Sequence, residues 1–328
     1  MLHITNGDSA AGCIAESGIG GDVLPWRDVL HEGPVPQGLG LDELSQVRAR
    51  FIAGSGWGSE ADVLASFRER DAELAGFRAH DEVVLWFEHD LYDQLQLIQL
   101  LEWFSSRHLE PTRLTLICNE EYLGTITTSR AREVFHERVA VTDDQMYLAR
   151  SAWAAFRSPN PTSVERLVEA GTPALPFLQG ALRRHLEQFP AADNGLSRSE
   201  RQALEAIGAG RDTIGDAFVA SSHEVEERIF LGDAIFFEYL ANLSQGPSPL
   251  VLCANGSPIE APQDEGDYRS FVEQRIVLTD EGRSVLAGAL DWLALRPIDR
   301  WLGGVHLVGW SLEWRWHAGM NRLIGGWP

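Results

Sequence analysis

The sequence predicts an α/β protein that begins with a mainly parallel sheet, and two observations support this prediction. Residues 83–87, Val-Val-Leu-Trp-Phe, have the length and β-branched character of a buried strand. After a polar triplet, apolar residues return at helical spacing over 91–104. Because a buried strand followed at once by a helix is half of a βαβ unit, the first domain is expected to be Rossmann-like.

The length of 328 residues exceeds what one ordinary hydrophobic core supports. Composition shifts along the chain predict three parts. Residues 1–141 are expected to form the α/β domain, 142–195 a helical connector that ends in a linker at 190–195, and 196–328 a winged-helix-like α+β domain.

Composition excludes several classes of function. The 27 basic residues are all arginine, so a Walker-A phosphate loop and Schiff-base chemistry, which need lysine, are excluded. A net charge of −21 repels phosphate backbones and argues against nucleic-acid binding. Three scattered cysteines without a CxxC motif indicate a reducing compartment and no structural zinc site. Without an 18-residue apolar run or a signal pattern, the protein is expected in the cytoplasm and not in a membrane.

The first strand is expected at 2–5, and Asn6-Gly7-Asp8-Ser9 leads from it into a helix over 10–17. Asp8 or Ser9 could simply cap this helix. Alternatively, a glycine turn at a helix N-terminus forms an anion site, in which Asn6 and Gly7 hold the ligand and Asp8 and Ser9 take part in catalysis. The residues alone leave both interpretations open.

The second strand, 22–26, runs into a loop that contains Asp28 and His31 and ends in Gly33-Pro34-Val35-Pro36. The prolines exclude a helix or a central strand here. Asp28 and His31 are a candidate acid–base or metal-binding pair, and a solvated loop with an incidental histidine is the alternative. Helices follow at about 41–53 and 60–77.

The triplet after the strand at 83–87 is the main candidate site. Asp90 and Asp93 stand in the positions of a reciprocal helix cap, whereas Glu88 and His89 are not needed to start a helix. A further strand at 113–118 ends in Asn119-Glu120. Because parallel strands end at one edge of a sheet, these side chains predict a ligand site there, with His89 and Asp90 as catalytic candidates.

Three blocks of the sequence, HITNGDSAAG, LPWRDVLHEGPVP and VVLWFEHDLYDQLQLIQLL, resemble the family of uncharacterised bacterial proteins called DUF1835. The resemblance covers about residues 2–120. It implies a shared α/β domain and a prokaryotic cytosolic origin, and it implies no activity. The matching positions add Gly33 and Gln94 to the candidate ligand-binding residues, beside Glu88, Asp93, Asn119 and Glu120.

The remaining chain is expected to be helical at 143–157, 163–170 and 173–189, and then winged-helix-like. Its helices are expected at 196–207, 213–220 and 224–243, its wing strands at 249–253 and 275–278, and a last helix at 280–290. The third of these helices is acidic, and residues 191–328 carry 11 arginines against 20 acidic residues. We therefore expect this domain to contact a protein partner and not DNA. The Trp- and Arg-rich tail after 299 is expected to pack in a core, with a ligand role as the alternative.

Two hypotheses follow. The first is an enzyme, a hydrolase or group transferase that acts on a small anionic or nucleotide-like molecule. The second is a ligand-sensing regulatory protein whose C-terminal domain contacts a protein partner. Paired histidines and carboxylates exceed what ligand binding requires, which favours the enzyme. The sequence identifies neither a metal nor a cofactor.

Overall fold

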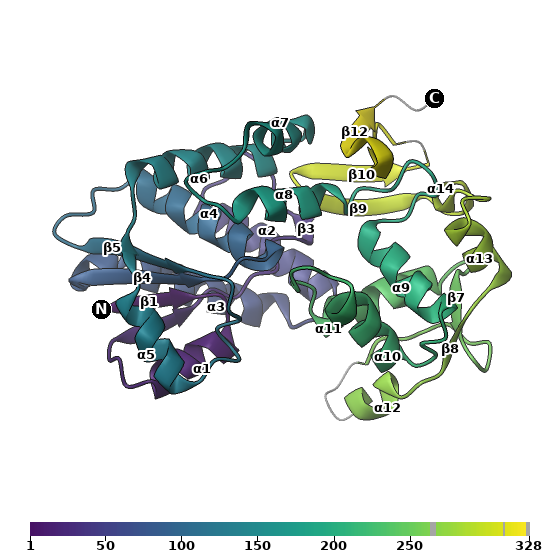
Figure 1. Cartoon of the computed structure of the whole chain (residues 1–328), viewed down its shortest axis with the longest axis horizontal. Helices are drawn as coiled ribbons and strands as arrows, with labels where there is room; N and C mark the ends of the chain where they lie inside the picture. Colours follow the sequence, from purple (N-terminus) through teal and green to yellow (C-terminus); the bar gives the residue numbers. More distant parts are fainter. Residues whose placement is uncertain (263–266, 311, 326–328) are drawn as a thin grey trace. The chain divides into compact units, whose positions relative to one another are not determined.

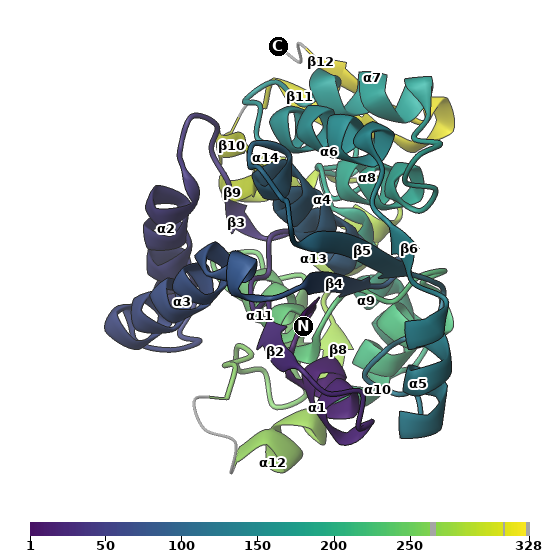
Figure 2. The same cartoon turned by 90° about the vertical axis from the view of Figure 1, so that its left-hand side faces the viewer.

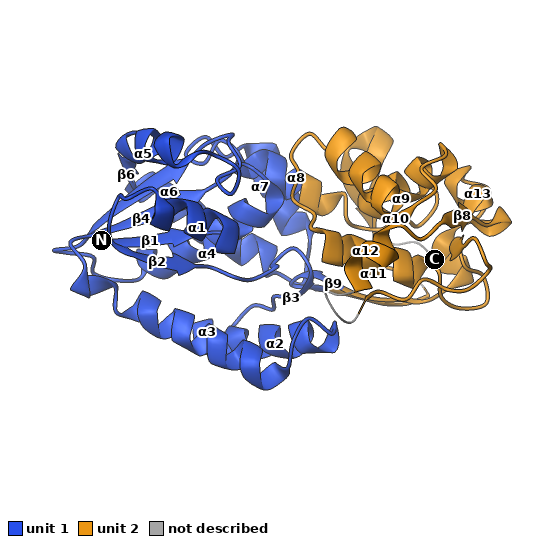
Figure 3. Ribbon diagram, turned by 90° about the horizontal axis from the view of Figure 1, so that it is seen from below, with its two compact units in different colours: residues 1–183, 301–305 blue, residues 184–300, 306–328 orange. Residues whose placement is uncertain are grey.

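The structure is a computed structural model that describes residues 1–262, 267–310 and 312–325. The chain forms two compact units, coloured separately in Figure 3. Unit 1 contains residues 1–183 and 301–305, and unit 2 contains 184–300 and 306–328. Residues 142–183 therefore belong with the α/β domain. No helix in the described ranges is both long and apolar enough to cross a membrane.

Unit 1 contains the predicted α/β sheet. The sheet consists of five strands in the order β2-β1-β4-β5-β6, of which all but β6 run parallel. The strands are β1 (Leu2–Thr5), β2 (Asp22–Pro25), β4 (Glu82–Phe87), β5 (Arg113–Cys118) and β6 (Val139–Ala140). The four predicted strands of this domain are confirmed to within one residue at each end. The antiparallel edge strand β6 was not predicted.

Helices cover both faces of the sheet. Figures 1 and 2 show α4 and α6 on one face and α1 and α5 on the other. Every residue of β4 is buried, which explains the continuous apolar run at 83–87. On the α1 side, Val84 and Trp86 of β4 pack against Ala10 and Ile14 of α1. The helices of unit 1 are α1 (Asp8–Glu16), α2 (Leu41–Gly54), α3 (Glu60–Ala75), η1 (Phe77–Ala79), α4 (Leu91–Ser105), α5 (Thr128–His136), α6 (Asp143–Phe156), α7 (Thr162–Ala170) and α8 (Leu178–Leu186), which extends across the unit boundary.

A late segment of the chain completes unit 1. The short strand β3 (Gly33–Pro34) pairs in parallel with Leu302 and Gly303 at the end of β9 (Ile298–Gly303). A Cβ on the neighbouring Gly304 would lie 1.9 Å from the carbonyl oxygen of Arg157, so only glycine allows this approach. Part of the Trp- and Arg-rich tail is thus a structural strand of the first unit.

Unit 2 is built from short helices and two-stranded sheets. Three α-helices and one π-helix precede the antiparallel pair β7–β8, which lies close to the predicted positions of the wing strands. Its elements are α9 (Arg198–Gly208), α10 (Ile214–Phe218), the π-helix η2 (Val219–Glu224), α11 (Asp233–Leu243), β7 (Val251–Cys253), α12 (Tyr268–Val272), β8 (Ile276–Leu278), α13 (Asp280–Leu286), α14 (Trp292–Leu295), the first half of β9 (298–300), β10 (Val305–Gly309) from residue 306 on, β11 (Trp314–His317), η4 (Ala318–Met320) and β12 (Arg322–Gly325).

Three predictions for the second half of the chain were wrong in detail. The helix expected over 224–243 begins only at Asp233, after the extended N-cap Gly232. The helix expected over 173–189 is shortened to α8, because a proline at 176 within the expected helix would remove a backbone donor. The expected linker at 190–195 is instead fixed: the N–H of Ala192 bonds to Trp316, and the carbonyl of Asn194 accepts from Trp292.

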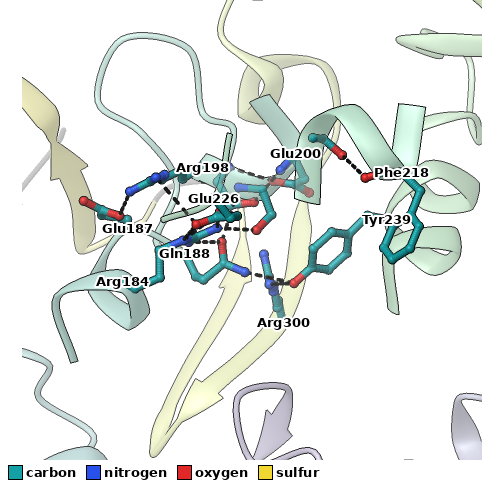
Figure 4. A network of polar contacts seen from close by, with 12 residues as sticks. Arg184, Glu187, Gln188, Arg198, Glu200, Phe218, Glu226, Tyr239 and Arg300 are labelled. Atoms are coloured by element: carbon teal, nitrogen blue, oxygen red, sulfur yellow. Dashed lines mark hydrogen bonds and ion pairs between the residues drawn. The ribbon is translucent and has the colours of Figure 1, made fainter. Parts of the chain in front are cut away.

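A buried ionic network explains why the segment before α11 leaves the helix. Arg184 binds both carboxylate oxygens of Glu226, and their side chains are only 9% and 5% exposed. Arg184 also donates to Gln188, which in turn donates to Tyr239 on α11 (Figure 4). The requirement to place the Glu226 carboxylate inside this network competes with helix propensity at 225–232.

Candidate functional site

The sheet topology places the candidate site at a topological switch point. From β1 the chain first adds β2 on one side and later adds β4 on the other. Ligands of open α/β sheets bind outside the carboxyl ends of the strands at such a reversal. Asn6 follows β1 at this point, and Glu88 follows β4. The prediction of one shared strand-end edge is therefore confirmed.

Three buried carboxylates converge at the start of α4. Oxygen atoms of Glu88, Asp90 and Asp93 lie within 4.8 Å of one another, and each residue is less than 5% exposed. Asp90 is the N-cap of α4, and its Oδ1 accepts from the N–H of Asp93 at 3.1 Å. We refer to these three residues as the acidic cluster.

Asp93 does not complete the reciprocal cap that the sequence suggested. Its Oδ1 accepts instead from the backbone N–H of Glu88 at 2.8 Å. Its Oδ2 accepts from the amide Nδ2 of Asn6 at 2.7 Å, and the same Nδ2 donates to Glu88 Oε1 at 3.2 Å. A single amide from β1 thus holds two carboxylates of the acidic cluster.

Two further groups hold this arrangement. The backbone N–H of Leu123, in the segment after β5, donates to Glu88 Oε1 at 2.7 Å. The hydroxyl of Tyr92, on α4, donates to the carbonyl of Asn6 at 3.1 Å. The turn after β1, the start of α4 and the segment after β5 are therefore joined around Glu88 by hydrogen bonds.

The electrostatics of the acidic cluster favour a bound proton or cation. Burial, and then the charge of Asp90, raise the pKa of Glu88 to about 7. Burial and the neighbouring carboxylates also raise the pKa of Asp93. Near neutral pH the acidic cluster can therefore hold a proton for acid–base chemistry. Its oxygen-only ligand set would alternatively suit a hard divalent cation such as Mg²⁺, Mn²⁺ or Ca²⁺.

Three buried polar atoms at the same edge lack a hydrogen-bond partner among the described residues. They are Thr5 Oγ1 at the end of β1, Gln94 Oε1 in the first turn of α4, and Asn119 Nδ2 directly after β5. Buried polar atoms are normally satisfied, and exceptions call for an explanation. A ligand with its own polar atoms would satisfy them.

The two candidate histidines lie in aromatic surroundings. His89 is buried, with its ring centroid 5.2 Å from that of Tyr122 and 6.0 Å from that of Phe177. His31 is also buried, and its ring lies 5.8 Å from the ring of Tyr92. Since Tyr92 bonds to the backbone carbonyl of Asn6, His31 is connected to the acidic cluster through two residues, Tyr92 and Asn6.

Asp28 has a structural partner that the sequence did not indicate. Its carboxylate forms a fully buried ion pair with Arg48 of α2, with an N–O distance of 2.9 Å. Arg48 also donates to the carbonyls of Glu32 and Val29, which fixes the loop after β2. Asp28 is therefore neutralised by Arg48, and this pair secures the loop that also carries His31.

The turn after β1 differs from the predicted cap. Gly7 is the N-cap of α1 and makes no side-chain cap bond, so the capping role suggested for Asp8 or Ser9 was wrong. Asp8 is instead paired with Arg27, two residues after β2, through three hydrogen bonds. Ser9 is exposed in the first turn of α1, and a Cβ on Gly124 would lie 2.9 Å from its own Cβ.

The other ligand-binding candidates have different positions. Gly33 has φ +74°, and a Cβ there would lie 2.5 Å from the ring of Phe51, so close packing explains this glycine. Gln94 donates to the carbonyl of Glu88 at 2.6 Å and thus belongs to the site. Glu120 is exposed.

Sequence reasoning missed Arg27, Tyr92 and the Leu123 N–H. Arg27 directly follows the second strand, so the strand-end rule that selected Asn6 and Glu88 could have selected it. Tyr92 lies next to Asp93 and Gln94, which sequence reasoning did select, and its hydroxyl could have been considered with them. A backbone donor such as the Leu123 N–H leaves no signal in a sequence.

Together the fold and the site define a mixed α/β protein with a buried acidic cluster at the switch point of its parallel sheet. No family model matches the chain, and no curated protein matches it as a relative.

Proposed function

We propose that unit 1 is an enzyme, a hydrolase or group transferase, that acts on a small anionic or nucleotide-like molecule with a divalent cation at the acidic cluster. One observation carries this proposal: three buried carboxylates converge within 4.8 Å at the switch point of the sheet. Holding three such groups together is unfavourable unless a proton or a cation compensates them. Because these buried carboxylates lower the stability of the fold, the site is expected to have a function.

The chemistry of the chain's own residues fits this class of reaction. In the cation-free protein the pKa of Glu88 is about 7, so Glu88 can exchange a proton at neutral pH. With a cation bound, its carboxylate would serve as a ligand instead. Asn6 and the Leu123 N–H keep its carboxylate in place. A cation bound by the acidic cluster would supply a Lewis acid that polarises a substrate oxygen.

A regulatory role is the second candidate, and the element order of unit 2 favours it. Apart from the π-helix η2 before α11 and the short helix α12 between the two strands, helices α9, α10 and α11 and the antiparallel pair β7–β8 follow the order of a winged helix. The acidic character of residues 191–328 then suits a protein partner better than DNA.

Two further statements belong to the proposal. The three sequence blocks support membership of the DUF1835 family. The three free cysteines support a cytoplasmic location.

Cation binding tests the proposal directly. We expect Mn²⁺ or Mg²⁺ to bind the wild-type protein with one site per chain in titration calorimetry. Glu88→Gln and Asp93→Asn should weaken this binding at least about tenfold, because each removes a charged ligand. A turnover screen with nucleotides and phosphorylated metabolites then identifies the reaction.

Glu82→Gln is the matched control, because Glu82 is an equally buried carboxylate at the opposite end of β4, where Arg113 and Arg138 neutralise it. This variant should lose stability and keep its cation affinity. Absence of cation binding and turnover in the wild type would refute the enzyme proposal. A saturable ligand without turnover would favour the regulatory candidate.

A further inference from the structure

Arg27 forms a pair with Asp8 that has the geometry of oxyanion recognition. Its Nε donates to both carboxylate oxygens of Asp8, at 3.1 and 2.9 Å, and its Nη2 donates to Oδ1. Planar guanidinium groups bind carboxylate and phosphate in this forked manner. The Asp8 carboxylate thus occupies the position that an oxyanion of a ligand would take on Arg27.

This pair is open to exchange. The side chains of Arg27 and Asp8 are 52% and 72% exposed, and exposed pairs of this kind contribute little to stability. The Asp28–Arg48 pair nearby is fully buried and does not share this property. A ligand could therefore displace Asp8 from Arg27 without disrupting the fold.

The surroundings of the pair also favour an anion. Asp8 is the first residue of α1, whose N-terminus has no side-chain cap, whereas α3 to α6 are each capped by a side chain. Uncapped helix N–H groups attract anions. Around Gly7 the space is open, because a Cβ there would have no neighbouring heavy atom within 4 Å.

An independent observation comes from Thr5, which is fully buried and whose hydroxyl lacks a partner among the described residues. Thr5 lies in register with Trp86 on the neighbouring parallel strand, so the two side chains share a face of the sheet. Trp86 packs against Ala10 in the first turns of α1. The Thr5 hydroxyl is therefore directed toward the α1 side of the sheet, where it can meet a bound oxyanion.

We infer that Arg27 binds the oxyanion of the substrate and that Asp8 occupies Arg27 until the substrate displaces it. The inference rests on the proposed function and specifies the substrate class, a small molecule that carries a phosphate or carboxylate group.

The inference also explains how an acidic protein can bind an anion. A chain of net charge −21 repels anions, so a local cation is needed at the site. With Asp8 removed, Arg27 supplies that charge beside the α1 N-terminus.

Anion titrations in EDTA test this inference separately from cation binding. Inorganic phosphate and acetate are titrated into the wild type, Asp8→Asn and Arg27→Gln by calorimetry. Asp8→Asn should raise the affinity for the preferred anion by up to about fivefold. The reason is that the Asp8 carboxylate no longer competes for Arg27, and an exposed ion pair of this kind contributes little free energy. Arg27→Gln should lower the affinity at least about tenfold. The tighter of the two anions identifies the substrate group.

Arg211→Gln and Glu224→Gln are matched controls, because these residues form an ion pair in unit 2 in which each side chain is 47% exposed. Both should leave anion affinity unchanged, and the melting temperatures of all variants confirm that they fold. The inference is overturned if Asp8→Asn weakens binding, if Arg27→Gln binds like the wild type, or if the wild type binds neither anion at concentrations on the order of 10 mM. If the protein binds a cation but no anion, the inference about Arg27 is overturned and the cation site is not. If it binds an anion but no cation, only the cation site is overturned.

Discussion

The carboxylate of Asp93 accepts a hydrogen bond from the backbone N–H of Glu88 at 2.8 Å, so the first turn of α4 holds the residue that follows β4. This contact turns the chain back on itself and brings the Glu88 side chain within reach of Asn6. A reciprocal cap would have used Asp93 only to start the helix. Its use for Glu88 instead is what assembles the acidic cluster.

Neutralising Glu88 should stabilise the cation-free protein. Because its pKa is raised from 4.5 to about 7, the folded state holds a proton that the unfolded state loses first. Stability due to this group is therefore present below about pH 4.5 and falls as the pH rises to about 7. In EDTA at pH 8, we expect the free energy of unfolding of Glu88→Gln to exceed that of the wild type by up to about 3 kcal/mol. At pH 4.5 the two free energies should differ little.

Denaturant unfolding across this pH range checks the prediction. At a given Mg²⁺ concentration the ion should raise the unfolding free energy of the wild type more than that of Glu88→Gln, because the variant binds the ion more weakly. Equal pH profiles for the two proteins would show that Glu88 ionises normally.

His3 should give a pH dependence of opposite sign. Its Nδ1 accepts from Trp86 Nε1 at 3.0 Å and its Nε2 lies 3.0 Å from the Gly20 carbonyl, which together require the neutral ring. Burial lowers its pKa below 6.5, so the unfolded state binds the proton first and stability is lost as the pH falls below about 6.5. At pH 8, His3→Gln should lower the free energy of unfolding by about 1–3 kcal/mol, because the Trp86 N–H loses its acceptor. The variant should also lose the part of the acid dependence that is due to His3.

The readout for His3 is the unfolding free energy between pH 5 and pH 8, with nitrogen NMR of the ring to identify the tautomer. A protonated ring in the folded protein at neutral pH would contradict the hydrogen-bond assignment.

Removing Arg48 should be severe. Arg48→Met leaves the Asp28 carboxylate buried without its partner, and breaking a buried ion pair in this way costs about 3–5 kcal/mol. Arg50 lies two residues further along α2, is exposed, and donates to the carbonyl of Gln46. Arg50→Met should cost less than about 0.5 kcal/mol. Thermal unfolding of both variants tests this difference. Similar losses of stability would show that the buried Asp28–Arg48 pair stabilises the fold no more than the exposed Arg50 does.

Much of the first unit could be predicted because its signals are local. The strands at 2–5, 83–87 and 113–118 were recognised from short apolar runs, and their polar ends located the site edge. Unit 2 was predicted less well. Its helix at 224–243 was interpreted from periodicity alone, whereas the network around Glu226 determines the backbone there.

Local sequence patterns were sufficient to predict the class of fold and the edge of the sheet at which polar side chains gather, since helical and strand periodicity are properties of neighbouring residues. Which of those side chains meet could be seen only in the folded chain. Asp28 and Asp8 looked equivalent in the sequence, yet one is neutralised by Arg48 in the interior and the other forms an exposed pair with Arg27. Likewise, Asn6 reaches Asp93 across 87 positions of the chain. Such pairings depend on the packing of distant segments, and no local pattern encodes them.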